Sequence, residues 1–187
     1  MNLLLGVCGG IAAYKAAELV SLATKRGHAV RVILTDNAAR FVGPVTFEAL
    51  SGHPVMVGHA HLDPGQALAH IQWAKWAELA VVAPLSANVL GKLACGLADD
   101  ALTTVLMALP RGKPVLLAPA MNTEMWQHPV VQRNCGWLRD LGDRYHWIDP
   151  VSKRLACGDT GVGGLPDPAE ILTRAEGLLP CRSGDGG

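Results

Sequence analysis

Short apolar runs alternate with longer segments of helical spacing along most of this chain. The runs at 3–7, 30–34, 79–83, 115–118 and 145–148 have the length and composition of buried strands. Between them, apolar residues recur every three or four positions, as they do on the buried face of a helix. This alternation predicts βαβ units and therefore a single α/β domain with a Rossmann-like or flavodoxin-like fold, an open parallel sheet with helices on both faces.

Other segments are predicted from helix signals or from the absence of any period. Residues 55–65 have no clear pattern, and we interpret the Gly-rich stretch at 155–168, which has neither helical nor strand period, as a lid. We expect one domain over 1–180 and a disordered tail over 181–187. The predicted helices lie at 12–26, 44–50, 70–77, 88–95, 124–141 and 168–179, with a short one that carries Phe41 and another after Cys95.

Composition narrows the classes of protein. Half of the 187 residues are hydrophobic. The 16 basic residues balance 16 acidic ones, so the net charge does not favour binding to nucleic acid or to an anionic membrane. The five cysteines form no C-x-x-C pair, which argues against a disulfide scaffold or a zinc ribbon. The first apolar run lacks the basic flank of a signal peptide, and no run is long enough to span a bilayer. We expect a soluble cytoplasmic protein.

Polar and glycine residues follow four of the predicted strands, where open parallel sheets bind their ligands. They are Gly9 and Gly10, the stretch 35–37, the stretch 86–88, and Met121 with Asn122. Gly9 and Gly10 open a helix, so that backbone N–H groups and the helix dipole favour an anion such as phosphate; a tight turn without a ligand is the alternative. Ser86 and Asn88 open another helix, and taken alone such residues are more often helix caps than ligand positions.

Five ordered motifs give the chain a specific resemblance over residues 3–172. The chain resembles the homo-oligomeric flavin-containing cysteine decarboxylases, which include phosphopantothenoylcysteine decarboxylases and enzymes that act on the C-terminal cysteine of peptide natural products. The residues that carry the resemblance are GVCGGIAAYK at 6–15, HI at 70–71, PLSAN at 84–88, PAMNTEMW at 119–126 and ACGD at 156–159.

The resemblance implies FMN, bound between the subunits of a homotrimer that often assembles further into a dodecamer. It implies that His70 is the catalytic base, that Asn122 binds the substrate carboxylate, that Met125 lines the substrate pocket and that Cys157 is a catalytic proton donor on the lid. The flavin positions that it implies are Gly9, Gly10, Ile11, Thr35, Asp36, Asn37, Ser86, Ala87, Asn88, Val89 and Ala120.

The branch of the family is less sharply marked. Cys157 matches the proton donor of the phosphopantothenoylcysteine branch, but Gly164 stands where that branch usually has an arginine. Loss of this cation from a lid that closes over a phosphorylated substrate favours a peptide with a C-terminal cysteine, decarboxylated oxidatively to an aminoenethiol as in cypemycin-like pathways. Phosphopantothenoylcysteine decarboxylation in coenzyme A synthesis is the alternative. A non-catalytic regulatory flavoprotein trimer is a further alternative. The sequence lacks the phosphate-binding serine and arginine pattern that a prenyl-flavin synthase would need.

The remaining histidines and cysteines are interpreted as structural. His53, His59 and His61 lie near Asp63 without closed ligand spacing, and we expect them to be solvated and assign no metal. Cys8 and Cys95 lie in apolar segments and are expected to be buried and inert.

Overall fold

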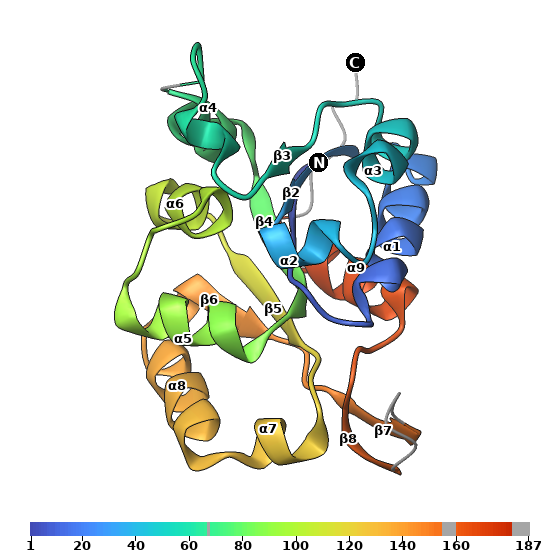
Figure 1. Cartoon of the computed structure of the whole chain (residues 1–187), viewed down its shortest axis with the longest axis vertical. Coiled ribbons are helices and arrows are strands. Elements are labelled where there is room, and N and C mark those ends of the chain that lie inside the picture. Colours follow the sequence, from blue (N-terminus) through green and yellow to red (C-terminus); the bar gives the residue numbers. More distant parts are fainter. Residues whose placement is uncertain (67, 155–159, 181–187) are drawn as a thin grey trace.

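The computed structural model describes residues 1–66, 68–154 and 160–180. Its main element is a parallel sheet of six strands in the order β3-β2-β1-β4-β5-β6 (Figure 1). This is the strand order of the Rossmann fold. All strands of this sheet are parallel, and the direction in which successive strands are added to the sheet reverses between β1 and β4. The predicted open parallel sheet is confirmed. The strands are β1 (Asn2–Val7), β2 (Ala29–Leu34), β3 (Met56–Val57), β4 (Leu79–Leu85), β5 (Val115–Pro119) and β6 (Tyr145–Trp147).

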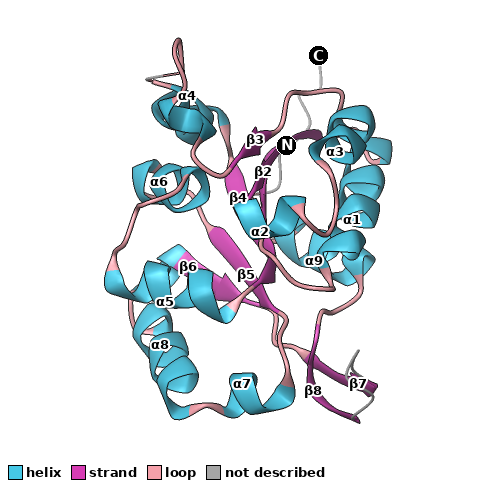
Figure 2. Cartoon of the chain, in the orientation of Figure 1, coloured by secondary structure: helices cyan, strands magenta, loops and turns pink. Residues whose placement is uncertain are grey.

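Helices cover both faces of the sheet, as predicted (Figure 2). One face is covered by α1 (Ala13–Lys25), α3 (Pro44–Ser51) and α9 (Pro168–Glu176). The other is covered by α4 (Ala69–Trp76), α5 (Ala87–Cys95), α6 (Ala101–Ala108) and α8 (Pro129–Arg139). The remaining helical elements of the described residues are short: α2 (Asp36–Ala39), α7 (Thr123–Gln127) and the 3-10 turns η1 (Ala60–Leu62) and η2 (Gly142–Arg144).

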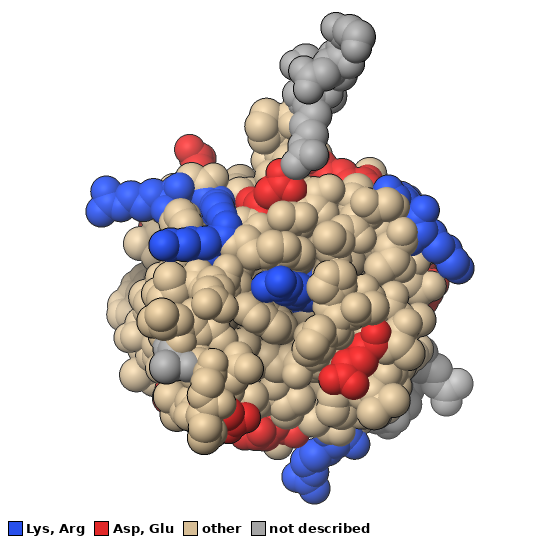
Figure 3. Space-filling model, turned by 90° about the horizontal axis from the view of Figure 1, so that it is seen from above, with Lys and Arg blue, Asp and Glu red and all other residues tan. Residues whose placement is uncertain are grey.

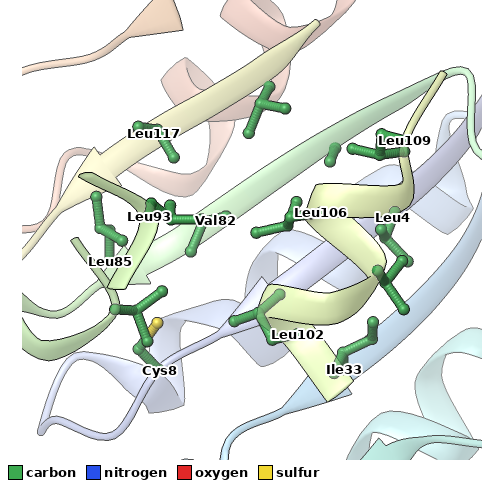
Figure 4. Packing of buried hydrophobic residues seen from close by; sticks show 14 of the residues in the cluster. Leu4, Cys8, Ile33, Val82, Leu85, Leu93, Leu102, Leu106, Leu109 and Leu117 are labelled. Atoms are coloured by element: carbon green, nitrogen blue, oxygen red, sulfur yellow. The ribbon is translucent and has the colours of Figure 1, made fainter. Parts of the chain in front are cut away.

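Alternation along the strands builds two cores, one on each face. In β1, Leu3, Leu5 and Val7 belong to the cluster under α1, α3 and α9, whereas Leu4 belongs to the cluster under α4, α5, α6 and α8. Figure 4 shows this second cluster, with the sulfur of Cys8 among aliphatic side chains. Because successive strand residues point to opposite faces, a nearly continuous apolar run serves both cores.

The predicted helix at 124–141 is two helices. The chain leaves helical geometry at His128, where φ is −59° and ψ is 130°. The reason is Pro129, which disfavours helical geometry in the preceding residue and begins α8 instead. The His128 ring accepts a hydrogen bond from the Val130 N–H at 3.3 Å and so caps this second helix. Phe41 likewise lies beyond the end of α2, outside the short helix predicted to carry it.

Part of the Gly-rich stretch is strand, contrary to its predicted lack of period. β7 (Val151–Arg154) and β8 (Thr160–Gly164) pair antiparallel, and we call them the β7–β8 hairpin. Close backbone approach explains the strand: a Cβ on Gly163 would meet the Met121 carbonyl oxygen, and one on Gly161 would meet the Thr123 side chain. The central part of the predicted lid, 155–159 with Cys157, and the predicted tail at 181–187 lie outside the described residues.

Charge is dispersed on the one face of the molecule that Figure 3 shows. On the face drawn in Figure 3, basic and acidic side chains are interspersed among uncharged residues. In the part of the chain that the structure describes, every helix is too short or too polar to cross a membrane.

Candidate functional site

A cavity of about 760 Å³ lies at the carboxyl ends of β1, β4 and β5, where the strand order reverses. Its size is in the range of small-molecule sites, and its place is where open parallel sheets bind ligands. In Figure 1, α7 and the β7–β8 hairpin lie at this end of the sheet. The lining residues come from five parts of the chain: residues 9–12 with Tyr14 and Lys15, Ser86 with Ala87, residues 120–122, Met125, and the hairpin with Leu165.

Backbone hydrogen bonds hold these parts together. The Cys8 N–H donates to the Pro84 carbonyl at 3.2 Å, which joins the loop after β1 to the end of β4. The Ala120 N–H donates to the Leu85 carbonyl at 3.0 Å, which joins the loop after β5 to the last residue of β4. The Met121 N–H donates to the Gly163 carbonyl at 3.0 Å and attaches the hairpin. The cavity wall is therefore fixed by main-chain contacts rather than by side chains alone.

The glycine loop after β1 fits an anion. A Cβ on Gly10 would meet nothing within 4 Å, so its backbone faces open space at the cavity. The Gly10 carbonyl accepts a hydrogen bond from the Ala13 N–H at 2.9 Å, which starts α1. Ala12, the N-cap of α1, gives no side-chain cap, and the first turn contains no acidic residue. The positive end of this helix is thus left for a ligand, as the sequence predicts.

The stretch Thr35, Asp36 and Asn37 supports the glycine loop but is not among the cavity's lining residues in the part of the chain that is described. Thr35 caps α2, because its hydroxyl accepts a hydrogen bond from the Ala38 N–H at 3.2 Å. Asn37 packs against Gly9. Asp36 is exposed, and its carboxylate lies 3.6 Å from the His59 ring. In a single chain, these three predicted flavin positions therefore lie behind the glycine loop and outside the cavity lining.

Residues Ser86 to Val89 differ in where their side chains lie relative to the cavity. Ser86 and Ala87 line the cavity. The Ser86 hydroxyl also accepts a hydrogen bond from the Val89 N–H at 3.3 Å, so it caps α5. The two interpretations of this residue, cap and ligand position, are therefore compatible. Asn88 is exposed, and the Val89 side chain is buried in the core, so neither side chain lines the cavity.

Cys8 lies directly before the glycine loop and is fully buried, as predicted. Burial raises the pKa of its thiol to about 12, although hydrogen bonding to Ser86 opposes the rise. Cys95 is exposed, contrary to the prediction. It ends α5, and Gly96 terminates the helix with a left-handed φ of 68°, which leaves Cys95 at the open end.

Ala120, Asn122 and Met125 line the cavity. Asn122 caps α7, because its Oδ1 accepts a hydrogen bond from the Glu124 N–H at 2.8 Å. Met125 is 48% exposed on the cavity side of α7, whereas Trp126 packs against the core. The structure therefore places Asn122 and Met125 at one cavity, and their substrate roles stay a prediction.

His70 lies on α4 and is not among the described residues that line the cavity. Its Nδ1 is buried without a hydrogen-bond partner in the described structure. Its ring lies edge-on to His61, with centroids 6.3 Å apart. His61 is buried, contrary to its predicted solvation, and burial together with the nearby His70 lowers the pKa of its imidazole. A single chain therefore does not bring His70 to Asn122.

Two lysines of the cavity have no predicted role. Lys15 belongs to the motif that carries the glycine loop, and its place in the first turn of α1 could have pointed to the site. Lys153 follows no motif, and only the pairing of β7 with β8 brings it to the cavity.

Comparison with known proteins identifies relatives over nearly the whole chain. The family model described as Flavoprotein matches residues 1–179. The chain is 48% identical over 175 residues to the coenzyme A biosynthesis bifunctional protein CoaBC of Bacillus subtilis, covering 94% of this chain but 42% of that protein. It therefore spans less than half the length of this relative. It is 45% identical over 178 residues to a probable phosphopantothenoylcysteine decarboxylase of Streptococcus mutans, covering 95% of this chain and 98% of that protein.

Solved structures share the fold. A mutant of PPC decarboxylase complexed with pantothenoylaminoethenethiol matches with a TM-score of 0.82 and 34% identity, covering 94% of this chain and 96% of that one. The FMN-dependent cysteine decarboxylase SpaF matches with a TM-score of 0.76 and 33% identity, covering 94% of each chain.

Proposed function

Because this chain belongs to the Flavoprotein family, we propose that it is an FMN-dependent decarboxylase that acts on phosphopantothenoylcysteine. The observation that carries the proposal is the cavity, which joins an uncapped helix terminus and glycine loop to Asn122. The substrate follows from the relatives at 45% and 48% identity, whose names refer to phosphopantothenoylcysteine or coenzyme A. They support the alternative reading of the sequence over the peptide substrate that the missing arginine favours.

The residues of the cavity fit FMN. The glycine loop and the N-terminus of α1 offer N–H groups to its phosphate, and Ile11, Ala120 and Met125 offer apolar surface to its ring. When bound, FMN would supply two-electron oxidation of the cysteine side chain, so that the oxidised carbon–sulfur group can accept the electrons released with CO₂. The protein has to orient the substrate, hold its carboxylate and handle protons.

Asn122 is assigned to the substrate carboxylate. Its Oδ1 is held by the Glu124 N–H, which fixes the plane of the amide before substrate arrives. An uncharged amide orients a carboxylate without stabilising its negative charge as strongly as a cation would, so departure of CO₂ is not opposed. Met125 provides the apolar wall beside it.

His70 is assigned as the base, and this assignment requires a second copy of the chain. The cavity of one chain is lined without His70, so the proposed homo-oligomer, a trimer by resemblance, brings the imidazole of one subunit to the cavity of another. Cys157, outside the described residues, is proposed as the proton donor that completes the redox-neutral reaction.

The test is the product mass after separate incubation of the flavin-loaded protein with phosphopantothenoylcysteine and with a peptide that ends in cysteine. We expect loss of CO₂ alone from phosphopantothenoylcysteine and an unchanged peptide. Loss of CO₂ and two hydrogens from the peptide, with the other compound unchanged, would assign the protein to peptide maturation. Absence of turnover with both compounds would favour a regulatory flavoprotein.

Substitution of the base gives a second test. His70→Asn should retain flavin and lose turnover, because the amide cannot exchange a proton near neutral pH. His53→Asn is a matched control, since His53 lies in a loop where its ring contacts the Ser51 carbonyl at 2.8 Å, outside the cavity. Full activity of His70→Asn would refute the assignment.

A further inference from the structure

Two lysines from distant parts of the sequence share the wall of the cavity. Lys15 lies in the first turn of α1, and Lys153 lies on β7. Burial and the neighbouring Lys15 ammonium together lower the pKa of Lys153. Both effects disfavour a second positive charge at this place unless an anion joins it.

Protein carboxylates do not neutralise this pair. Among the described residues, no Asp or Glu lies within ion-pair distance of Lys15 or Lys153, whereas Lys92 lies 2.7 Å from both Asp99 and Asp100. The Lys153 ammonium donates a hydrogen bond to the Leu165 carbonyl at 3.1 Å, which orients it but leaves its charge unbalanced. The pair is therefore a cationic site inside a cavity.

Gly164 determines where Lys153 lies. A Cβ on Gly164 would lie 2.6 Å from Cδ and 2.7 Å from Cγ of Lys153, so any side chain at position 164 would displace the lysine. The absence of an arginine at position 164 thus makes room for a different cation. The hydrogen bond from the Met121 N–H to the Gly163 carbonyl attaches this strand beside Asn122.

We propose that Lys153 and Lys15 together bind the phosphate monoester of the substrate. A phosphate monoester carries a charge between about −1.5 and −2 near neutral pH, which matches two ammonium groups. The inference rests on the proposed function, because it names the residues that select a phosphorylated substrate. FMN carries a phosphate of the same chemistry, and we assign that group to the glycine loop instead.

The kinetic test compares phosphopantothenoylcysteine with pantothenoylcysteine, which lacks the phosphate. For Lys153→Met and Lys15→Met we expect KM for the phosphorylated substrate to rise about ten- to hundredfold, because each variant loses a charge-assisted contact. KM for pantothenoylcysteine and kcat should stay unchanged. Lys153→Arg should keep most of the affinity. Lys25→Met, on the exposed end of α1, removes one charge outside the cavity and should match the wild type.

Two results would overturn the inference. An equal rise in KM for both substrates would mean that Lys153 only positions the hairpin. A weaker FMN affinity in either variant, measured by flavin fluorescence, would mean that the lysines bind the flavin phosphate.

A binding measurement separates this inference from the proposed function. Calorimetric titration of the flavin-loaded protein with phosphopantetheine and with pantetheine needs no turnover. Tighter binding of phosphopantetheine that both Met variants abolish would support the lysine subsite even if the protein failed to decarboxylate phosphopantothenoylcysteine. Equal binding of the two compounds by the wild type would refute the subsite, whatever the activity.

Discussion

Gly9 packs against Asn37 so closely that a Cβ on Gly9 would stand 2.9 Å from the Asn37 carbonyl carbon. This contact packs the loop after β1 against α2. It explains why Asn37 supports the glycine loop although it does not line the cavity in one chain.

Gly9→Ala should therefore destabilise the fold by about 1–3 kcal/mol, because the Asn37 backbone would have to move. Gly10→Ala is the matched control: a Cβ there would meet nothing within 4 Å, so its stability should stay within about 0.5 kcal/mol of the wild type. Urea unfolding of both variants measures the difference. Equal stability would show that the loop after β1 and α2 are free to separate.

We expect the Arg144 side chain to contribute strongly to the stability of the fold. Its guanidinium donates to four carbonyls, those of Leu106, Leu109, Pro110 and Lys113, at 2.9 to 3.4 Å. Arg144→Met should cost about 1.5–3 kcal/mol, and Arg144→Lys should recover only part of it, because lysine lacks the planar fork. Thermal unfolding measures this, with the exposed Arg111→Met as control. A melting temperature for Arg144→Met equal to that of the control would contradict the prediction.

His61 should make the fold sensitive to mild acid. Burial, with His70 and His59 nearby, lowers the pKa of His61, while Asp100 and Asp63 oppose the effect. Below about pH 6.5 the unfolded chain then binds a proton that the folded chain does not, so stability falls as pH falls. One such proton accounts for at most about 1.4 kcal/mol per pH unit.

The measurement is urea unfolding at about pH 7 and about pH 5. His61→Leu should reduce the loss of stability between the two, because the buried titrating group is gone. His53→Gln, which removes a ring that lies 2.8 Å from the Ser51 carbonyl and is not among the groups that act on His61, should keep the wild-type loss. An unchanged pH dependence in His61→Leu would assign the acid sensitivity to another group.

Thiol reactivity should follow burial. Iodoacetamide at about pH 8 should modify Cys95, which is exposed, and spare Cys8 and Cys135, which are buried and whose pKa values burial raises. Peptide mass mapping identifies the modified residues, and Cys95→Ser is the control. Modification of Cys8 as fast as that of Cys95 would mean that the loops after β1 and β4 open readily.

The order of elements could be predicted because it depends on local patterns. The runs at 3–7 and 79–83 are almost continuously apolar, which is typical of strands that are buried on both faces of a sheet. Gly9, Gly10 and Ser86 are typical of loops that precede helices. The break at Pro129 could also have been read from the sequence, since proline constrains the residue before it. The strand at 160–164 could not, because its glycines pack against Met121 and Thr123 rather than alternating in polarity.

The sequence by itself determined the α/β fold class with its open parallel sheet, the loops at which a ligand is expected and the family motifs, because these depend on residue type and spacing. Only the tertiary structure decided which residues meet. It brought Lys153 to Lys15 through the pairing of β7 with β8, and it buried His61 beside His70 away from the cavity. Such contacts join residues far apart in the chain, and their charge and burial depend on neighbours that no local pattern specifies.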